Sequence, residues 1–333
     1  MENEVLTVNE PKKHPFRVFF NEGKGWLFLA PSLVLLAIFT FYPLIQSMIY
    51  AFQNGYDGYT FDGWGFANFQ RVFSYAQFGY CLVNTLVFAF ISVPVSTIIA
   101  LMISVGLNAI KPLREVYQTI FFIPYLTNAI AVGAVFGTMF TVISTTGTIE
   151  GAQSVGLINT WFHTRIDWMR VVDPVTDGTV AGMWKAAITD KQLWLNRTVV
   201  LVFSIWEGLP FKILILFSAL QNVNKQYYDA AKIDGASKWT TLIKVTVPLI
   251  SPMLSYLIVT GFIGGFKAYT SVIGVFGKES VSRKPVNTMV GYIMDQLHSD
   301  KIGLASAGAL VLFGIILIFT LINLRMSKKR VHY

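Results

Sequence analysis

LVNTLVFAFISVPVSTIIALMISVGL, residues 82–107, contains no Asp, Glu, Lys or Arg. An α-helix needs about 20 consecutive apolar residues to cross the hydrocarbon core of a bilayer, and this run is long enough. Its few polar side chains are Asn, Ser and Thr, which membrane helices tolerate. The stretch therefore predicts a transmembrane helix.

The rest of the chain repeats this pattern. Of its 333 residues, 54% are hydrophobic and 13% are charged, whereas a soluble domain typically carries about 25% charge. Turn residues divide the other apolar sequence into five further runs, and we therefore predict an all-α integral membrane protein with six spanning helices. The predicted spans are 26–52, 82–107, 116–141, 198–220, 248–276 and 302–324.

Prolines inside several spans predict kinked helices around a pathway. A proline would break a soluble helix, but neighbouring helices in a membrane bundle can satisfy the freed carbonyl groups. These prolines are Pro43, Pro94, Pro124 and Pro210.

The basic residues indicate the orientation of the chain. The net charge is +8, but the Lys and Arg residues lie between apolar runs rather than in one patch, which disfavours nucleic-acid binding. With both termini in the cytoplasm, 14 basic residues fall on the cytoplasmic side and 10 on the outer side, as the positive-inside rule requires. The predicted parts are cytoplasmic segments 1–25 and 325–333 and a transmembrane domain 26–324 that includes an outer loop, 143–197, and a cytoplasmic loop, 222–247.

Cysteine and histidine content argues against several kinds of site. Cys81 is the only cysteine, so no intrachain disulfide can form. The four histidines are isolated and lack metal-ligand spacing. The sequence also shows no acid, base or metal cluster of the kind that a membrane enzyme acting on lipid-linked substrates would need. The charged N-terminal residues and the long apolar run after them are not typical of a cleaved signal peptide.

The cytoplasmic loop contains YYDAAKIDGASKWTTLIKVTVPLISP, residues 227–252. Good helix formers occupy 228–233, and a second helix can run from 236 to 246. Between them, Gly235 in the Asp234-Gly235 pair can adopt a positive φ. We therefore expect two short helices joined by a tight corner, which is either a docking element for a partner or an ordinary amphipathic linker.

This stretch resembles the cytoplasmic signature of ABC importer permeases, E-A-A-x-x-D-G-A followed by two prolines. Asp229 stands where that family usually has Glu, so the acidic charge is retained. FFIPYLTNAIAVG at 121–133 and GLINTWF at 156–162 look like the first permease of the carbohydrate-importer branch, and the resemblance extends over nearly the whole chain. The matching signature residues are Ala230, Ala231, Asp234, Gly235, Ala236, Pro248 and Pro252.

The resemblance implies a six-helix ABC importer transmembrane domain with cytoplasmic coupling helices, in the plasma membrane of a bacterium or archaeon. Such a subunit pairs with a second homologous permease, binds two ATPase subunits, and receives a carbohydrate from an extracellular solute-binding protein. ATP and Mg would be bound by the ATPase subunits, and this chain would hold no cofactor, metal or catalytic residue. The implied ATPase-coupling residues are Asp229, Ala230, Ala231, Asp234, Gly235 and Ala236.

Two other functions stay open at this point. The same architecture could import a different solute, such as glycerol phosphate. A secondary transporter driven by an ion gradient is the second alternative, but it usually has more helices or an inverted repeat.

Three ionisable residues in the predicted spans are candidates for the substrate path. Glu207 and Lys212 interrupt the fourth span, and Lys267 lies in the fifth. Such side chains need a partner or water inside a membrane, and a hydrated sugar path would supply water. Alternatively, Glu207 and Lys212 pair with each other or with a neighbouring subunit, and Lys267 reaches toward an interface.

Two further patterns also have two interpretations each. Gly261 and Gly265 form a GxxxG pattern, which indicates close helix packing more often than a ligand site. The tryptophans of the outer loop indicate either a folded cap that receives a soluble partner or a belt at the membrane interface. These are Trp161, Trp168, Trp184 and Trp194.

Overall fold

A computed structural model describes residues 15–110, 114–144, 152–154, 156–171 and 180–330. The chain forms two compact units, residues 1–50 and 51–333. The described part of the first unit consists of helix α1 (Pro15–Leu36), the π-helical turn η1 (Ala37–Phe41) and most of α2 (Tyr42–Phe52). Residues 26–52 have a mean hydropathy of 2.1 and largely exposed apolar side chains, as expected of a helix whose solvent is lipid.

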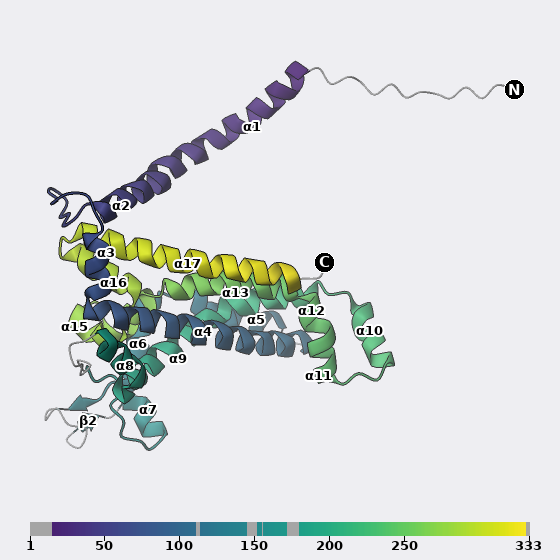
Figure 1. The fold of residues 1–333 in the computed structure, drawn as a ribbon. Coiled ribbons are helices and arrows are strands. Elements are labelled where there is room, and N and C mark those ends of the chain that lie inside the picture. Colours follow the sequence, from purple (N-terminus) through teal and green to yellow (C-terminus); the bar gives the residue numbers. More distant parts are fainter. Residues whose placement is uncertain (1–14, 111–113, 145–151, 155, 172–179, 331–333) are drawn as a thin grey trace. The chain divides into compact units, whose positions relative to one another are not determined.

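The second unit is built around four helices that run alongside one another (Figure 1). They are α4 (Ala76–Ala109), α9 (Lys191–Gln221), α13 (Ser251–Phe266) and α17 (Ile302–Arg330). Helix α4 packs against both α9 and α13, and α13 packs against α17. Because these helices are apolar on most sides, aromatic and aliphatic side chains such as Phe88, Phe203 and Phe266 fill the space between them.

Four helices of the described chain are long and apolar enough to cross a membrane, and two bent helix pairs raise the number to six if each pair is one span. The helices are Trp26–Phe52, Gln77–Ala109, Lys191–Gln221 and Ile302–Met326. The predicted fold class, an all-α integral membrane protein, is confirmed. The fourth span differs in length, because α9 starts at Lys191 and includes residues predicted to lie in the outer loop.

The third predicted span is not one continuous helix. It consists of α5 (Arg114–Leu126) and α6 (Ala129–Phe140), which meet at an angle of 94°. The Thr127 hydroxyl donates a hydrogen bond to the carbonyl of Pro124 at 2.7 Å. The Asn128 side chain then caps α6 by accepting from two backbone N–H groups. A capping residue directly after the end of α5 therefore starts a new helix in a new direction.

The fifth predicted span is also divided. Helix α13 ends at Phe266, and α14 (Thr270–Phe276) follows as a separate short helix. On the other side, residues 238–249 meet α13 at 72°. Pro252 lies in the first turn of α13, where its missing N–H group costs no helical hydrogen bond.

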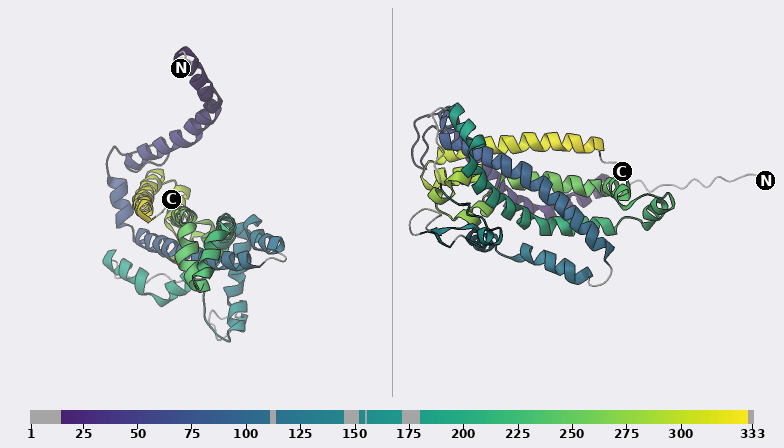
Figure 2. Two further views of the ribbon diagram at one scale, coloured as in Figure 1. Left: turned by 90° about the vertical axis from the view of Figure 1, so that its right-hand side faces the viewer. Right: turned by 90° about the horizontal axis from the view of Figure 1, so that it is seen from below.

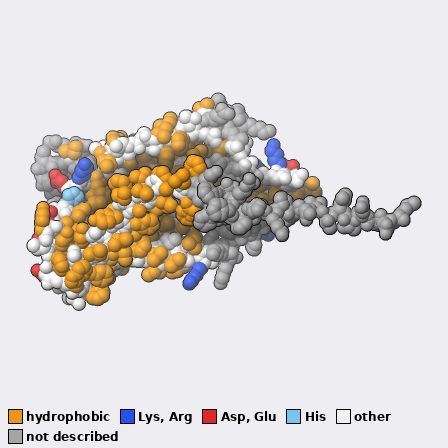
Figure 3. Space-filling view, turned by 90° about the horizontal axis from the view of Figure 1, so that it is seen from above, with side chains coloured by type: hydrophobic (Ala, Val, Ile, Leu, Met, Phe, Trp, Pro, Cys, Tyr) orange, Lys and Arg blue, Asp and Glu red, His pale blue; other side chains and the backbone are white. Residues whose placement is uncertain are grey.

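Short elements gather at the two ends of the second unit, as two views show (Figures 1 and 2). At one end lie α10 (Lys225–Ile233), α11 (Lys238–Thr241), the π-helical turn η2 (Leu242–Thr246) and α12 (Val247–Leu249). In the face drawn in Figure 3, hydrophobic side chains are far more numerous than charged ones. At the opposite end lie α3 (Ala67–Ser74), α7 (Gly156–Trp161), α8 (Val180–Thr189), α15 (Ser280–Arg283), the 3-10 turn η3 (Lys284–Val286), α16 (Met289–His298) and the antiparallel strands β1 (Ile143–Ser144) and β2 (Ala152–Ser154).

Candidate functional site

The loop at 222–247, which was predicted to be cytoplasmic, forms the expected corner between two short helices. Helix α10 ends at Ile233, and α11 begins at Lys238 after a cap in which the Ser237 hydroxyl accepts from the N–H group of Thr240. Gly235 joins them with a φ of +69°, in the left-handed region that favours glycine. No atom lies within 4 Å of the place where a Cβ on Gly235 would be, so the requirement for glycine is conformational rather than steric.

The side chains around this corner face solvent. Asp229, Ala230 and Asp234 are exposed, and Ile233 is 86% exposed although it is strongly apolar. Asp229 lies 3.4 Å from Lys232, but both side chains are mostly exposed, and such a surface pair contributes little to stability. Of the signature residues, Ala231 alone is buried. The corner therefore presents a charged and apolar surface that no other described residues cover.

A polar cavity of about 210 Å³ lies within the helix bundle of the second unit. Helices α4, α9 and α13 supply most of its wall, and the residues around the α13–α14 break supply the rest. It contains two of the three predicted substrate-path residues. The lining residues are Phe88, Ser92, Val93, Ser96, Ser204, Glu207, Gly208, Lys212, Gly261, Gly264, Gly265, Ala268 and Ser271.

Glu207 and Lys212 share the cavity, but each bonds to other parts of the chain. Lys212 is 7% exposed and donates hydrogen bonds to the carbonyl of Val93 at 3.1 Å and to the Ser96 hydroxyl at 2.5 Å. Glu207 accepts a hydrogen bond from the Ser271 hydroxyl at 2.6 Å. Among the described residues, the two side chains form no ion pair with each other.

Lys267, the third predicted substrate-path residue, is placed differently. It is the residue that follows the last turn of α13, and its side chain is exposed. It does not contribute to the lining of the polar cavity. The division of the fifth span thus takes Lys267 out of a helix and places it in a turn.

Two glycines of α13 serve close packing. A Cβ on Gly261 would lie 2.8 Å from a methyl carbon of Val93, and one on Gly265 would lie 2.9 Å from the Cα of Ala89. Both positions therefore bring α13 directly onto α4, as the packing interpretation of the GxxxG pattern predicted. At Gly264, by contrast, no atom lies within 4 Å of such a Cβ.

A second, larger cavity lies at the end that carries the corner. Its volume is about 340 Å³, and its walls come from the end of α9, the start of α10 and the α12–α13 junction. Ala219, Val223, Leu249 and Met253 make much of this lining apolar. It lies beside the start of α10 and shares no lining residue with the polar cavity.

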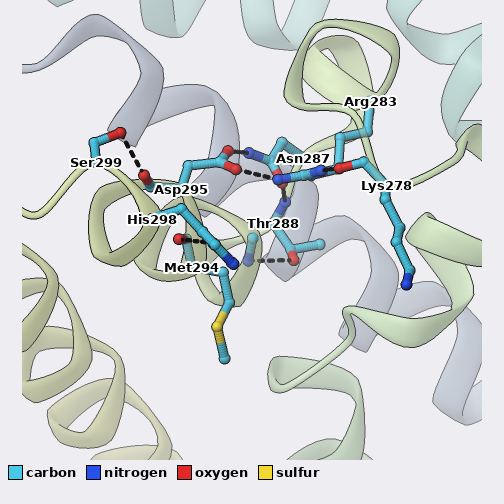
Figure 4. Close-up of polar contacts among 9 residues, drawn as sticks. Lys278, Arg283, Asn287, Thr288, Met294, Asp295, His298 and Ser299 are labelled. Atoms are coloured by element: carbon cyan, nitrogen blue, oxygen red, sulfur yellow. Dashed lines mark hydrogen bonds and ion pairs between the residues drawn. The ribbon is translucent and has the colours of Figure 1, made fainter.

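A polar cluster at the opposite end was not predicted from the sequence (Figure 4). Arg283 forms an ion pair with Asp295, and these side chains are only 4% and 16% exposed. Arg283 also donates to the carbonyl of Lys278, and Asn287 donates to Asp295 at 2.8 Å. Thr288 extends the cluster by donating to the carbonyl of Ala268 at 2.6 Å. No sequence signal linked these residues, because their spacing fits no motif.

Buried polar side chains connect this polar cluster to the long helices. Asn84 of α4 donates to the carbonyls of Pro285 at 3.1 Å and Asn287 at 2.9 Å. The same Asn84 side chain accepts a hydrogen bond from Arg197 of α9 at 2.6 Å. Arg197 is fully buried, and its guanidinium lies 5.1 Å from the ring centre of Trp194. The segment that contains Pro285 and Asn287 is thereby held against both α4 and α9.

The outer tryptophans differ in their surroundings. The Trp168 ring donates to Asn159 at 3.0 Å and packs against Phe140, and the Trp194 ring donates to the carbonyl of Ile188. Trp161 is 66% exposed, whereas the side chain of Trp184 lies outside the described residues. Trp168 and Trp194 therefore make contacts within the protein that hold these segments together.

Comparisons with known proteins give a consistent picture. Residues 63–332 match the family described as "Binding-protein-dependent transport system inner membrane component". The chain is 27% identical over 320 residues to the arabinooligosaccharides transport system permease protein AraP of Bacillus subtilis, covering 95% of this chain and 93% of that protein. It is 26% identical over 256 residues to the lactose transport system permease protein LacF of Rhizobium radiobacter, covering 76% of each.

Solved structures show the same fold. A bacterial ABC transporter involved in the import of the acidic polysaccharide alginate contains a chain with a TM-score of 0.72 and 20% identity, covering 95% of this chain and all of that one. The alginate transporter in complex with its pentasaccharide-bound periplasmic protein gives a TM-score of 0.74 and 19% identity, with 95% and 98% coverage. At this identity the likeness concerns the fold.

Proposed function

The chain belongs to the family of binding-protein-dependent transport system inner membrane components, and on that basis we propose that it is a permease subunit of an ATP-driven importer of a sugar or oligosaccharide. The family description already implies a multi-pass membrane protein that works with a binding protein. The observation that carries the proposal is the exposed corner at Gly235, which would serve as a docking surface at one end of the spanning bundle.

Sugar as the substrate class rests on the relatives and on the cavity. AraP is named for arabinooligosaccharides, LacF for lactose, and MsmF of Streptococcus mutans for multiple sugars. The polar cavity offers hydroxyl groups and a carboxylate, which hydrogen-bond well to sugar hydroxyls. Glu207 and Lys212 would line this subunit's half of the path, and Lys267 would lie at the turn beyond it.

The proposed assembly has further subunits. A second, homologous permease would complete the pathway, and two ATPase subunits would bind ATP and Mg, because this chain would carry no ATPase site of its own. An extracellular solute-binding protein would deliver the sugar. Both termini would lie in the cytoplasm of a bacterial or archaeal cell, on the same side as α10 and α11.

Coupling would pass through the corner. Closure of the ATPases on ATP would move α10, where Asp229, Ala230 and Ala231 lie, and the turn formed by Asp234, Gly235 and Ala236. The long helices would then tilt from an inward-open to an outward-open arrangement. Such rigid-body switching transmits work over a distance without covalent chemistry in the permease.

Affinity co-purification in mild detergent tests this proposal. The intact chain is compared with a variant carrying Asp229→Lys and Gly235→Val. We expect the intact chain to recover a second permease and an ATPase, and the variant to lose the ATPase while still entering the membrane. A matched Lys185→Glu variant, which reverses an exposed charge on α8 at the other end, should keep the ATPase.

Two results would contradict the proposal. A solitary chain that transports in liposomes without ATP would favour an ion-coupled secondary transporter. Binding of glycerol phosphate, rather than a sugar, by the purified binding protein would leave the architecture intact and change the substrate.

A further inference from the structure

The polar cavity contains one acidic and one basic side chain. Among its lining residues, Glu207 and Lys212 are the two ionisable ones, and the others are serines, glycines and apolar residues. When both side chains are ionised, their charges sum to zero. The cavity therefore has no surplus charge with which to balance a charged ligand. The inference below rests on the proposed function, in which this cavity is part of a sugar path.

The two charged groups are not equally available to a ligand. The Lys212 ammonium has three N–H donors, and it donates hydrogen bonds to the Val93 carbonyl and the Ser96 hydroxyl of α4. The Glu207 carboxylate uses one oxygen, Oε2, to accept from Ser271. Within the described part of the chain, its Oε1 has no hydrogen-bond partner. The Glu207 Oε1 atom is therefore more available to bind a ligand than the Lys212 ammonium.

Ser204 adds a second unused group to the cavity. It lies about one helical turn before Glu207 on α9, and its buried hydroxyl has no hydrogen-bond partner among the described residues. Buried polar groups in native proteins are rarely left without partners. A free carboxylate oxygen and a free hydroxyl together suit a ligand that donates several O–H groups.

We propose that Glu207 is a specificity-determining residue that makes this cavity select uncharged saccharides over carboxylated ones. The hydroxyls of a neutral sugar can donate to Glu207 and exchange hydrogen bonds with Ser204. A sugar carboxylate would instead approach the Glu207 charge, and burying an uncompensated charge is costly. This chain thus shares its fold with an importer of acidic alginate, but its cavity has the charge pattern for a neutral cargo.

Direct ligand binding tests this inference. The purified importer in lipid nanodiscs, without its binding protein, is titrated with maltotriose and with trigalacturonate by saturation-transfer NMR. We expect maltotriose to bind at least tenfold more tightly. Glu207→Gln leaves Lys212 as the sole charge in the cavity, so this ratio should fall at least tenfold. Glu279→Gln removes an exposed carboxylate outside the cavity and should leave the ratio unchanged.

A second variant separates charge from hydrogen bonding. Ser204→Ala removes a hydroxyl without changing the net charge, so it should weaken binding of both trisaccharides and preserve their ratio. Equal or tighter binding of trigalacturonate by the unaltered importer would overturn the inference. The same conclusion would follow from an unchanged ratio in Glu207→Gln, or from no binding of either sugar to an importer that retains its ATPase. Loss of the ATPase from the unaltered importer would instead contradict the proposed function.

Discussion

Arg283 and Asp295 form an ion pair that is largely shielded from solvent in the polar cluster shown in Figure 4. Removal of one partner from such a pair leaves an uncompensated charge. We expect Asp295→Ala to lower the free energy of unfolding by about 3 kcal/mol. Thermal unfolding in detergent measures this loss. Arg283→Met combined with Asp295→Leu should be less destabilised than Asp295→Ala, and a double variant that is more destabilised would contradict the prediction.

Gly235 permits a matched pair of substitutions at one position. Its φ of +69° is costly for a β-branched residue but accessible to Asn. Gly235→Val should therefore strain the corner by about 1–2 kcal/mol and reduce sugar-stimulated ATP hydrolysis. Gly235→Asn should retain most of that activity, because no neighbouring atom obstructs a side chain there. Equal activity of the two variants would show that the backbone conformation is not required.

At the scale of elements, the contact between α13 and α4 depends on small residues. Gly265→Ala would place a Cβ 2.9 Å from the backbone of Ala89, so one helix would have to shift. Overpacking of this kind typically costs about 1–3 kcal/mol. In Gly264→Ala, one residue away, the added Cβ would have no atom within 4 Å. Because alanine favours a helix more than glycine does, this variant should have an unchanged or slightly higher unfolding midpoint. A Gly265→Ala variant as stable as Gly264→Ala would mean that the two helices are not closely packed.

The sequence predicted the elements better than their interruptions. Long apolar runs located the four long helices and the two bent helix pairs, because burial in lipid demands long apolar stretches. The break at Thr127 and Asn128 was missed, since apolar residues continue on both sides and only the capping side chain of Asn128 starts the new helix. The end of α13 before Lys267 was missed as well, because apolar residues continue after it in the fifth run.

The candidate sites also differ in how far the sequence predicted them. The corner could be predicted, because Asp234-Gly235 between two helix-forming stretches is a local pattern. The polar cavity could be predicted only in part, since charges inside spans marked Glu207 and Lys212. Their separate partners, Ser271 and Val93, lie far away in the sequence, and such pairings are fixed by tertiary packing.

At the scale of the whole molecule, the proposed orientation can be tested by labelling. Cys81, the only cysteine, is fully buried, so it should not react with a membrane-impermeant maleimide in intact cells. We expect Ile233→Cys to be labelled only after the cytoplasmic side is opened. His163→Cys, at an exposed position of the outer segment, should be labelled in intact cells. Labelling of Ile233→Cys from outside would invert the orientation.

The glycine contact between α13 and α4 also limits how the bundle can move. To slide α13 along α4 by a full turn, about 5.4 Å, the chain would have to bring Leu257 to the place that Gly261 holds beside Val93, or Tyr269 to the place that Gly265 holds beside Ala89. Lys212 adds a tether from α9 to the same part of α4. The three helices are therefore held together at this point, and their packing opposes sliding of one helix past another. Access to the two sides of the membrane would alternate by tilting of one rigid block.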